Sequence, residues 1–380
     1  MKALIIGCGM VGPAAALALR RTGVDPVILE KAAGPRESTG GILNFPPNGM
    51  AILDALSCGP RIRHNGYVKV RYADDKRGAT DRPLYPFIAI RRNVAARVLR
   101  EAATEAGIPV EFGKELTGIH LPAAGGVEAR FHDGTTVTGD VLLGCDGVHS
   151  ATRRLLLPNT PKPRYTKRTY VTSRLQTGVP SAGRDSRLTY RTAASSFISN
   201  VSATGNAFWT AILYHPTQFA VTQHGEPSPK YWSAILEAEF GDAPAEILRL
   251  IRQNPPASSH QVYELPPLSR WFSGSACLLG DAAHASTPYH AQGFALGLED
   301  AVTLAACLKK HRGAGAAFME YQSVRKARCD YVVRSARRAG WLRNPSTHTQ
   351  KFIWKLFAQF YLPILDAEAA RIAAHRVPVL

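Results

Sequence analysis

One stretch of the chain, residues 276–304, indicates how the rest is organised, and it reads ACLLGDAAHASTPYHAQGFALGLEDAVTL. Its apolar start predicts a buried strand that ends at Gly280-Asp281. A loop of small residues follows, and a helix is predicted to begin near Gly293. An acidic side chain at a strand tip can accept hydrogen bonds from a polyol. Free N–H groups at a helix start can bind an anion or an electron-rich ring edge. These are the two needs of a flavin, which has a ribityl chain and a ring that becomes anionic on reduction.

The N-terminal residues support the same interpretation. A short apolar strand leads into Gly7-Cys8-Gly9-Met10-Val11-Gly12, and Pro13 suits the first turn of the helix that follows. A second apolar strand ends in Glu30. In this βαβ pattern the glycines permit a tight turn and close approach to a pyrophosphate, and the terminal acid can bind a ribose hydroxyl. The pattern predicts an ADP-containing dinucleotide; a glycine-rich turn in an unrelated α/β protein is the alternative.

Two further segments are candidates for the same ligand. The apolar run 141–143 leads into Gly144-Cys145-Asp146-Gly147. An Asp-Gly pair at a strand end is often only a turn, but beside a dinucleotide fold we expect it to help hold phosphates or ribose. Gly40-Gly41 opens a loop whose paired glycines allow close backbone approach. Passage of this loop along the flavin and a plain surface turn are equally supported by the spacing.

The composition limits the class of protein. The 380 residues are enough for two domains, and 45% of them are hydrophobic. The formal net charge of +17 favours anionic partners. The basic residues are scattered, however, which favours a solvated, arginine-rich surface, and no nucleic-acid partner is predicted. The six cysteines form no Cys-x-x-Cys pair and the twelve histidines show no ligand spacing. This predicts buried thiols and no metal site.

No export signal is recognisable at the N-terminus. Gly7, Gly9, Gly12 and Pro13 interrupt the apolar run that follows Lys2, so a strand, a turn and a helix explain the segment better. No other apolar stretch is long enough to span a bilayer. We therefore expect a cytoplasmic protein without a membrane partner.

The pattern changes between about residues 164 and 267. Short alternating runs, from Tyr170–Gln176 to Ala207–His215, predict a mainly antiparallel sheet with one buried face, and helices are predicted at 230–239 and 243–251. Earlier in the chain, Pro109–Gly113 is predicted to open a small antiparallel meander. The tail at 350–362 is amphipathic and rich in aromatic residues. We expect it to pack against the protein's own sheet, with membrane or partner contact as the alternative.

Three segments in a fixed order carry a family resemblance. They are Gly7-x-Gly9-x-x-Gly12 with Glu30, then Cys145-Asp146-Gly147-x-x-Ser150-x-x-Arg153, then Gly280-Asp281-Ala282-x-His284 with Pro288 and Gly293. Together they resemble the single-component (group A) FAD-dependent aromatic monooxygenases of the para-hydroxybenzoate hydroxylase fold. Residues 41–48 and the short chain are most similar to the branch with salicylate hydroxylase, 6-hydroxynicotinate monooxygenase and the flavin enzyme that inactivates tetracyclines.

The resemblance implies an α/β fold. It has a Rossmann-like FAD-binding domain, a second, mainly antiparallel β-sheet substrate domain, and C-terminal helices. The implied boundaries put the FAD-binding domain at 1–70, 91–163 and 268–340. The substrate domain takes 71–90 and 164–267, and the C-terminal helical segment takes 341–380.

The resemblance also implies non-covalently bound FAD, with NADH or NADPH as a transient reductant. Glu30 would bind the adenosine ribose, Asp281 the ribityl and pyrophosphate side, and Arg91 the ribityl or phosphate region, although Arg92 competes with Arg91. The implied cofactor-binding residues are Gly7, Gly9, Met10, Val11, Gly12, Glu30, Lys31, Gly41, Arg91, Asp146, Gly280, Asp281, Pro288, Gln292, Gly293 and Phe294.

The chemistry implied is hydroxylation of an aromatic or otherwise electron-rich small molecule by NAD(P)H and O2, through a flavin C4a-hydroperoxide. Epoxidation, Baeyer–Villiger oxidation, a reductase of the geranylgeranyl type and a flavoprotein that binds without turnover are the alternatives. The chain would act as a monomer or homodimer. No catalytic base declares itself. Tyr289 and Phe294 depart from the smaller residues usual in the family, and the candidate pocket residues are Phe45, Tyr214, His215, Pro288, Tyr289 and His290.

Overall fold

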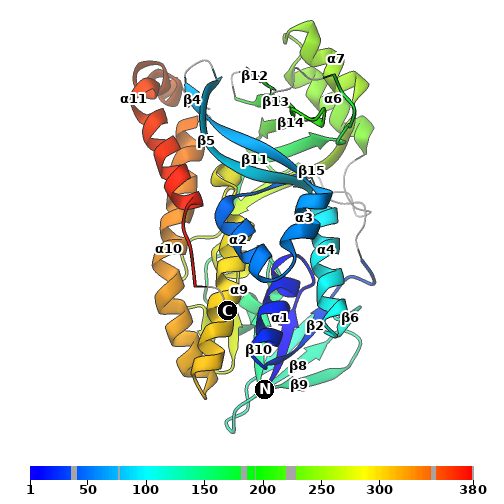
Figure 1. The fold of residues 1–380 in the computed structure, drawn as a ribbon, viewed down its shortest axis with the longest axis vertical. Coiled ribbons are helices and arrows are strands. Elements are labelled where there is room, and N and C mark those ends of the chain that lie inside the picture. Colours follow the sequence, from blue (N-terminus) through cyan, green and yellow to red (C-terminus); the bar gives the residue numbers. More distant parts are fainter. Residues whose placement is uncertain are drawn as a thin grey trace.

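The computed structural model describes residues 1–35, 41–75, 78–180, 186–192, 194–219, 228–343 and 348–378. Gly40, named above with Gly41, lies outside them. Figure 1 shows an elongated molecule with one sheet and its helices at the lower end and a second sheet at the upper end. Two long C-terminal helices run along one side of the molecule.

The lower sheet is a Rossmann-like, mainly parallel sheet. Its order is β16 (Phe272–Ser273), β17 (Ala276–Leu278), β10 (Val141–Gly144), β1 (Lys2–Ile6), β2 (Asp25–Glu30) and β6 (Val110–Phe112). All neighbouring pairs are parallel except β16 with β17. Strands β10 and β17 are buried along their whole length, as expected when helices cover both faces of a parallel sheet.

One strand prediction in this region is wrong. Pro109–Gly113 does not open the meander, because β6 pairs in parallel with β2. The antiparallel meander consists instead of β7 (Leu116–His120), β8 (Val127–Phe131) and β9 (Thr136–Gly139). A three-residue strand contains no signal for the direction of its partner.

Small residues let two helices approach each other beside the sheet. These are α1 (Val11–Arg21) and α9 (Gly293–Lys310). Val11 lies between two glycines: a Cβ on Gly280 would be 3.1 Å from the Val11 side chain, and one on Gly297 would be 2.5 Å from it. The contact therefore ties the start of α1 to the turn at Gly280. Helix α4 (Arg92–Glu105) packs on α1, and α5 (Ala151–Leu156) contacts β17. Helix α2 (Pro47–Ala55) packs on α9, and α3 (Gly59–Asn65) packs on α2 and α4.

The upper sheet is antiparallel, which confirms the prediction for residues 164–267. Its order is β12 (Ser186–Arg191), β13 (Ser196–Val201), β14 (Ala207–Tyr214), β11 (Arg164–Ser173) and β15 (Pro256–Glu264). Helices α6 (Pro229–Glu239) and α7 (Ala245–Gln253) cover it and form a separate core with Phe197, Trp209 and Phe240. Strand β15 was missed, because its sequence PASSHQVYE resembles a polar loop.

A small sheet joins the two parts. It contains β3 (Ile42–Phe45), β5 (Gly78–Arg91) and β4 (Tyr67–Asp75) in that order. The domain boundary predicted at residue 70 falls inside β4. The long helix α11 (His348–Ala373) packs against both β4 and β5 and against α10 (Ala314–Arg343).

The prediction for the aromatic tail is wrong in part. Ala358, Leu362 and Leu365 of α11 are buried, but Phe352 and Phe360 are each 64% exposed. Among the described residues, no helix is both long enough and apolar enough to cross a membrane.

Candidate active site

The predicted cofactor segments meet at one edge of the lower sheet. The Gly7 loop follows β1, Glu30 ends β2, Asp146 follows β10 and Asp281 follows β17. These strands are parallel neighbours, so their carboxyl ends lie at the same edge. Strand β1 lies between β10 and β2: the chain passes from β1 to β2 on one side and later adds β10 on the other. Such a switch point is where open α/β sheets bind their ligands.

The three glycines of the first loop have different roles. Gly7 has φ +105°, and a Cβ there would lie 2.8 Å from the Cys145 carbonyl oxygen. A Cβ on Gly12 would lie 2.0 Å from the Gly7 carbonyl oxygen. A Cβ on Gly9 would meet nothing within 4 Å. Two glycines are therefore required by packing, whereas Gly9 leaves the open space that a pyrophosphate would need.

This difference predicts opposite phenotypes for two alanine variants. Gly12→Ala should lower the stability of the flavin-free protein by about 1–3 kcal/mol, the usual cost of overpacking. Gly9→Ala should keep the stability of the flavin-free protein and lose FAD affinity. Thermal unfolding without FAD and flavin absorbance after gel filtration separate the two. Full FAD retention by Gly9→Ala would contradict the assigned role.

Glu30 is held in place by backbone amides. Its Oε2 accepts a hydrogen bond of 2.7 Å from the Cys8 N–H, and its Oε1 accepts one of 2.9 Å from the Ala32 N–H. The side chain is half-buried and Lys31 is exposed. Because an ionised carboxylate has about four acceptor positions, Glu30 can fix the Gly7 loop and still bind a hydroxyl.

Asp146 is used inside its own loop. Its Oδ1 accepts from the Ser150 hydroxyl at 2.5 Å, and its Oδ2 accepts from the Thr152 N–H at 2.9 Å and the Thr152 hydroxyl at 3.0 Å. The buried Arg153 extends this support by donating to the Ala282 carbonyl at 2.8 Å. The Asp146 side chain therefore fixes the start of α5, and Arg153 connects α5 to the Asp281 segment.

Asp281 is the most available acceptor at this edge. It is exposed, and among the described residues its carboxylate accepts no hydrogen bond. A Cβ on Gly293, the first residue of α9, would lie 3.7 Å from its Oδ1. The surrounding protein removes part of the water around this carboxyl, which raises its pKa although the residue is exposed. The charges of His284 and Arg92 oppose the rise. A carboxylate whose ionised form is destabilised, and which accepts no hydrogen bond from the described residues, is typical of a ligand-binding group.

Arg92 influences this region through its charge. Its charge lowers the pKa of both Asp281 and His260. Burial, Arg92 and His149 together lower the pKa of His260 to about 4, so His260 is neutral at pH 7. Arg91 lies at the end of β5, opposite Ile42 of β3. These effects favour Arg92 over Arg91, and the choice between the two arginines for the cofactor stays a prediction.

A buried polar network lies behind the Asp281 turn. Asp300 accepts from the Gly280 N–H at 2.9 Å and from Arg325 at 2.8 Å, and its Oδ2 lies 2.6 Å from His284 Nε2. Burial opposes the charged form of His284, but the charges around it, Asp300 among them, raise its pKa. The network fixes the Gly280 turn from its buried side.

The same network extends to Gln292. Arg325 NH1 lies 2.7 Å from Glu299 Oε2, and Arg328 also pairs with Glu299 at 2.7 Å. Asn48 donates at 2.9 Å to both Glu299 and Gln292. The side chain of Gln292, which is only 2% exposed, is therefore used inside the network, and only its backbone is left for the predicted contact with the cofactor.

Three residues of the network carry side-chain atoms that could coordinate a metal ion. His284, Asp300 and Cys329 bring three such atoms within 4.8 Å of one another. The Arg325 guanidinium already lies among them, 2.8 Å from Asp300 Oδ1 and 3.5 Å from Cys329 Sγ. Its positive charge would repel a metal ion, so we interpret the group as an ion-pair network.

The residues before α9 have divergent roles. Pro288 is exposed. His290 is buried and its Nε2 lies 2.8 Å from the Ser335 hydroxyl of α10, so it is a packing residue. Phe294 packs on the buried Phe45 with ring centroids 5.1 Å apart.

Tyr289 connects the two sheets. It follows Pro288 in the single turn η1 (Pro288–His290) and lies close enough to Tyr170 and Arg168 of β11 for both to influence the pKa of its hydroxyl. The Arg168 guanidinium also lies 4.7 Å from the centre of the Tyr214 ring and donates to the Ala194 carbonyl at 2.9 Å. Burial raises the pKa of Tyr170 and of Tyr289, so both hydroxyls stay protonated. Two predicted pocket residues, Tyr214 and Tyr289, are thus brought together by Arg168.

Two other predictions have different outcomes. His215 is engaged in its own turn, because its Nδ1 lies 2.7 Å from the Thr217 carbonyl oxygen and its ring packs on Phe219. Gly41 does approach the upper sheet: a Cβ there would lie 3.3 Å from the Thr172 hydroxyl. Sequence reasoning missed Arg168, Tyr170 and His260, which lie in strands with no recognisable motif.

The chain matches known proteins over most of its length. Residues 1–336 match the family described as FAD binding domain. The FAD-dependent urate hydroxylase of Mycolicibacterium vanbaalenii is 29% identical over 353 residues, which cover 89% of this chain and 88% of the relative. The 3-amino-4-hydroxybenzoate 2-monooxygenase of Streptomyces cremeus is 28% identical, with 89% and 86% covered.

Solved structures show the same architecture. Klebsiella pneumoniae HpxO complexed with FAD and uric acid has a TM-score of 0.80 at 24% identity, covering 98% of this chain and 96% of that one. A salicylate hydroxylase substrate complex has a TM-score of 0.73 at 21% identity, covering 100% and 99%. At these identities the likeness establishes the fold alone, and it confirms the predicted para-hydroxybenzoate hydroxylase-like architecture.

Proposed function

The chain belongs to the FAD binding domain family and is an FAD-dependent monooxygenase, and on that premise we propose that it hydroxylates a small aromatic or heteroaromatic compound with an acidic oxygen substituent. NADH or NADPH would be the reductant. The observation that carries the substrate class is the Arg168 cluster, defined as Arg168, Tyr170, Tyr214 and Tyr289. It joins the turn before α9 to the upper sheet.

The residues at the strand ends fit FAD. The Gly7 loop, with its open position at Gly9, would face the pyrophosphate, and Glu30 would bind the adenosine ribose. Asp281 would accept hydrogen bonds from the ribityl chain, with Arg92 taking the role first assigned to Arg91. The amides of Gln292, Gly293 and Phe294 at the start of α9 would face the ring edge. When bound, FAD supplies the electron transfer and oxygen activation.

The chain itself would position the substrate and exclude water. A guanidinium binds an anionic oxygen strongly, because the hydrogen bond is charge-assisted. The protonated Tyr170 and Tyr289 could donate to a second oxygen. Phe294, which packs on the buried Phe45, would provide an apolar surface next to Gly293, and such a dry surface would protect the reactive form of the cofactor. We therefore infer that residues 164–264 form the substrate side of the site.

Arg168→Met tests the substrate side alone. Loss of one charge-assisted hydrogen bond costs about 1.5–3 kcal/mol, so kcat/KM should fall by roughly 10- to 100-fold. FAD content should stay as in the wild type. Arg164→Met is the matched control, because Arg164 is an exposed arginine of the same strand. Equal kcat/KM for wild type and Arg168→Met would contradict the assignment.

A substrate panel tests the function. We would measure NAD(P)H oxidation and O2 uptake with urate, salicylate, 3-hydroxybenzoate and 3-amino-4-hydroxybenzoate, each beside its neutral or amide analogue. Stimulation by acidic rings and not by their analogues is expected. Stimulation by neither would refute the substrate class, and the products would separate hydroxylation from epoxidation and Baeyer–Villiger oxidation.

Two finer assignments stay predictions. One is placement nearest the salicylate hydroxylase and 6-hydroxynicotinate monooxygenase branch, since relatives of similar identity carry names for urate and aminohydroxybenzoate oxidation. The other is the domain division, for which we now propose that β4 and β5 stay together with the substrate side.

A further inference from the structure

We propose that one face of α11 docks this protein onto an anionic lipid bilayer. The α11 apolar face is defined as Phe352, Leu356, Phe357, Phe360 and Ile364. Their exposed fractions are 64%, 44%, 51%, 64% and 64%. Four of them recur every fourth residue, so they lie along one side of the helix. Soluble proteins rarely leave such a continuous apolar surface without an interaction to use it.

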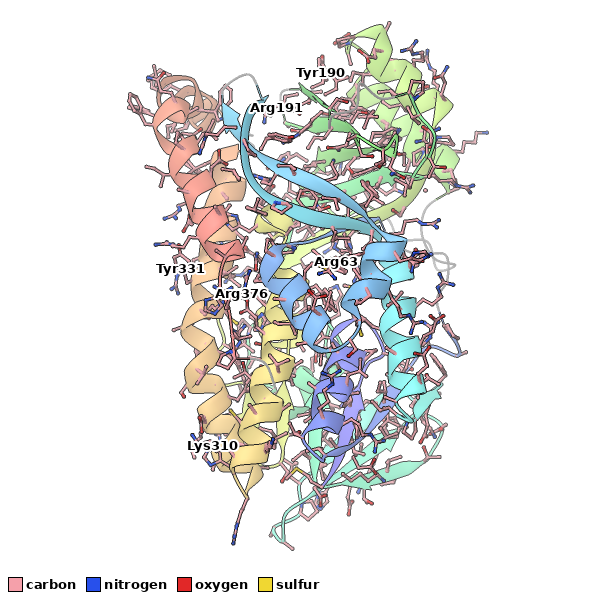
Figure 2. The ribbon with its side chains drawn as sticks, viewed as in Figure 1. Arg63, Tyr190, Arg191, Lys310, Tyr331 and Arg376 are labelled. Carbon is pink, nitrogen blue, oxygen red and sulfur yellow. The ribbon has the colours of Figure 1, made fainter. Side chains whose placement is uncertain are left out.

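The opposite side of α11 fixes this face toward solvent. Ala358, Leu362 and Leu365 are buried against the protein, and the Tyr361 hydroxyl donates to the Leu342 carbonyl of α10 at 3.2 Å. The guanidinium of Arg191 lies over the Trp354 ring at 5.8 Å, and Figure 2 shows Arg191 at the upper end of the molecule, between β12 and α11. The exposed side chains are therefore on the outside of a packed helix, not on an unattached one.

The charge of the sequence stretch that contains this face favours a bilayer as the occupant. Residues 331–365 contain no acidic residue and six cations: Arg334, Arg337, Arg338, Arg343, Lys351 and Lys355. Arg337 and Arg338 pair with Glu264 and Glu368, whereas Arg334 is exposed. An aromatic apolar face within a cationic segment is typical of helices that lie in the interface of anionic membranes.

A second copy of the chain fits less well. Two molecules with a net charge of +17 each repel one another, whereas an anionic bilayer attracts both. The stretch 331–365 contains no acidic residue, so it also offers no carboxylate to the same stretch of a second copy. Surface docking agrees with the finding that no described helix could cross a membrane. It revises the earlier expectation of no membrane partner.

Vesicle binding by the full FAD-loaded chain tests the proposal. Co-sedimentation is measured with phosphatidylcholine vesicles and with equal mixtures of phosphatidylcholine and phosphatidylglycerol. The wild type should bind the mixed vesicles, more weakly at high salt, and bind the neutral ones little. Phe357→Glu combined with Phe360→Glu should weaken binding at least about tenfold, because two large apolar contacts are lost. Both changes are at exposed positions, so thermal unfolding should be unaltered.

The matched control is Met319→Glu combined with Val324→Glu. These side chains of α10 are 60% and 55% exposed, so the control makes the same change in charge and also removes two exposed apolar side chains elsewhere. It should bind within about twofold of the wild type. Equal loss in both double variants, equal binding to both kinds of vesicle, or no binding by the wild type would overturn the proposal.

Light scattering tests whether a second copy of the chain occupies the α11 apolar face. A wild-type dimer that Phe357→Glu with Phe360→Glu converts to a monomer, without vesicle binding, would identify a second copy as the occupant and refute bilayer docking. None of these measurements depends on turnover. Failure here would therefore leave the proposed monooxygenase activity intact, and failure of that activity would leave docking intact.

Discussion

An Asp281→Ala variant is expected to fold normally and to be purified without FAD. Two charge-assisted hydrogen bonds to the ribityl side would be lost, roughly 3–6 kcal/mol. That corresponds to a decrease in FAD affinity of roughly a hundredfold to ten-thousandfold. Flavin absorbance after gel filtration and titration of the flavin-free protein with FAD measure the effect. Asp281→Asn, which keeps one acceptor oxygen, should be intermediate.

The raised pKa of Asp281 adds a second expectation for the flavin-free protein. Because the folded surroundings disfavour the ionised form, the charge costs stability at pH 7. The flavin-free Asp281→Ala protein should therefore be at least as stable as the flavin-free wild type. Retention of FAD with wild-type affinity would refute the site, and a large loss of flavin-free stability would make Asp281 a structural residue instead.

The second large effect is expected for Arg325→Met. Arg325 is 1% exposed and pairs with both Glu299 and Asp300. Removing it would leave two buried carboxylates without their shared cation, which typically costs about 3–5 kcal/mol. Urea unfolding measures the loss. Arg61→Met is the control: its ion pairs with Glu101 and Glu105 are on the surface, where a pair contributes about 0–1 kcal/mol.

The pH dependence of the stability of Arg325→Met tests whether the buried carboxylates cause the loss. Arg325 lies among the charges that lower the pKa of Glu299 and Asp300 against the effect of burial. In the wild type, that contribution to stability is present above the ordinary carboxyl values of 4.5 and 3.8 and is lost at lower pH. In the variant these carboxyls can take up protons. The difference in free energy of unfolding between wild type and variant should therefore become smaller as the pH falls through this range. A loss of unfolding free energy no larger than that of Arg61→Met would contradict the account.

The sequence could predict the parts of the fold that depend on local signals. The strand ends at Gly7, Glu30, Asp146 and Asp281 each follow an apolar run, and all four meet at one edge of the sheet. Strand β6 was assigned to the wrong sheet and β15 was missed, because short or polar strands are specified by their partners. The aromatic residues of α11 were expected in the core, since helical spacing alone does not say which side of a helix is covered.

The site residues could be predicted from the sequence only where they lie in a segment with a recognisable motif. Tyr289 and Tyr214 were candidates for the pocket, but the residue that connects them, Arg168, has no motif. Its role depends on the approach of η1 to β11, which are far apart in the sequence. The choice between Arg91 and Arg92 likewise depends on the register at the end of β5, which leaves Arg92 to begin α4.

The central claim is that this chain transfers oxygen from O2 to an acidic ring compound. The most direct measurement is turnover of the best compound in the panel under 18O2, with mass spectrometry of the product and parallel assay of hydrogen peroxide. We predict a product that contains a single 18O atom for each NAD(P)H consumed, with little peroxide, and the same product at a lower kcat/KM from Arg168→Met. Consumption of NAD(P)H that yields only peroxide, or a product without 18O, would contradict the account.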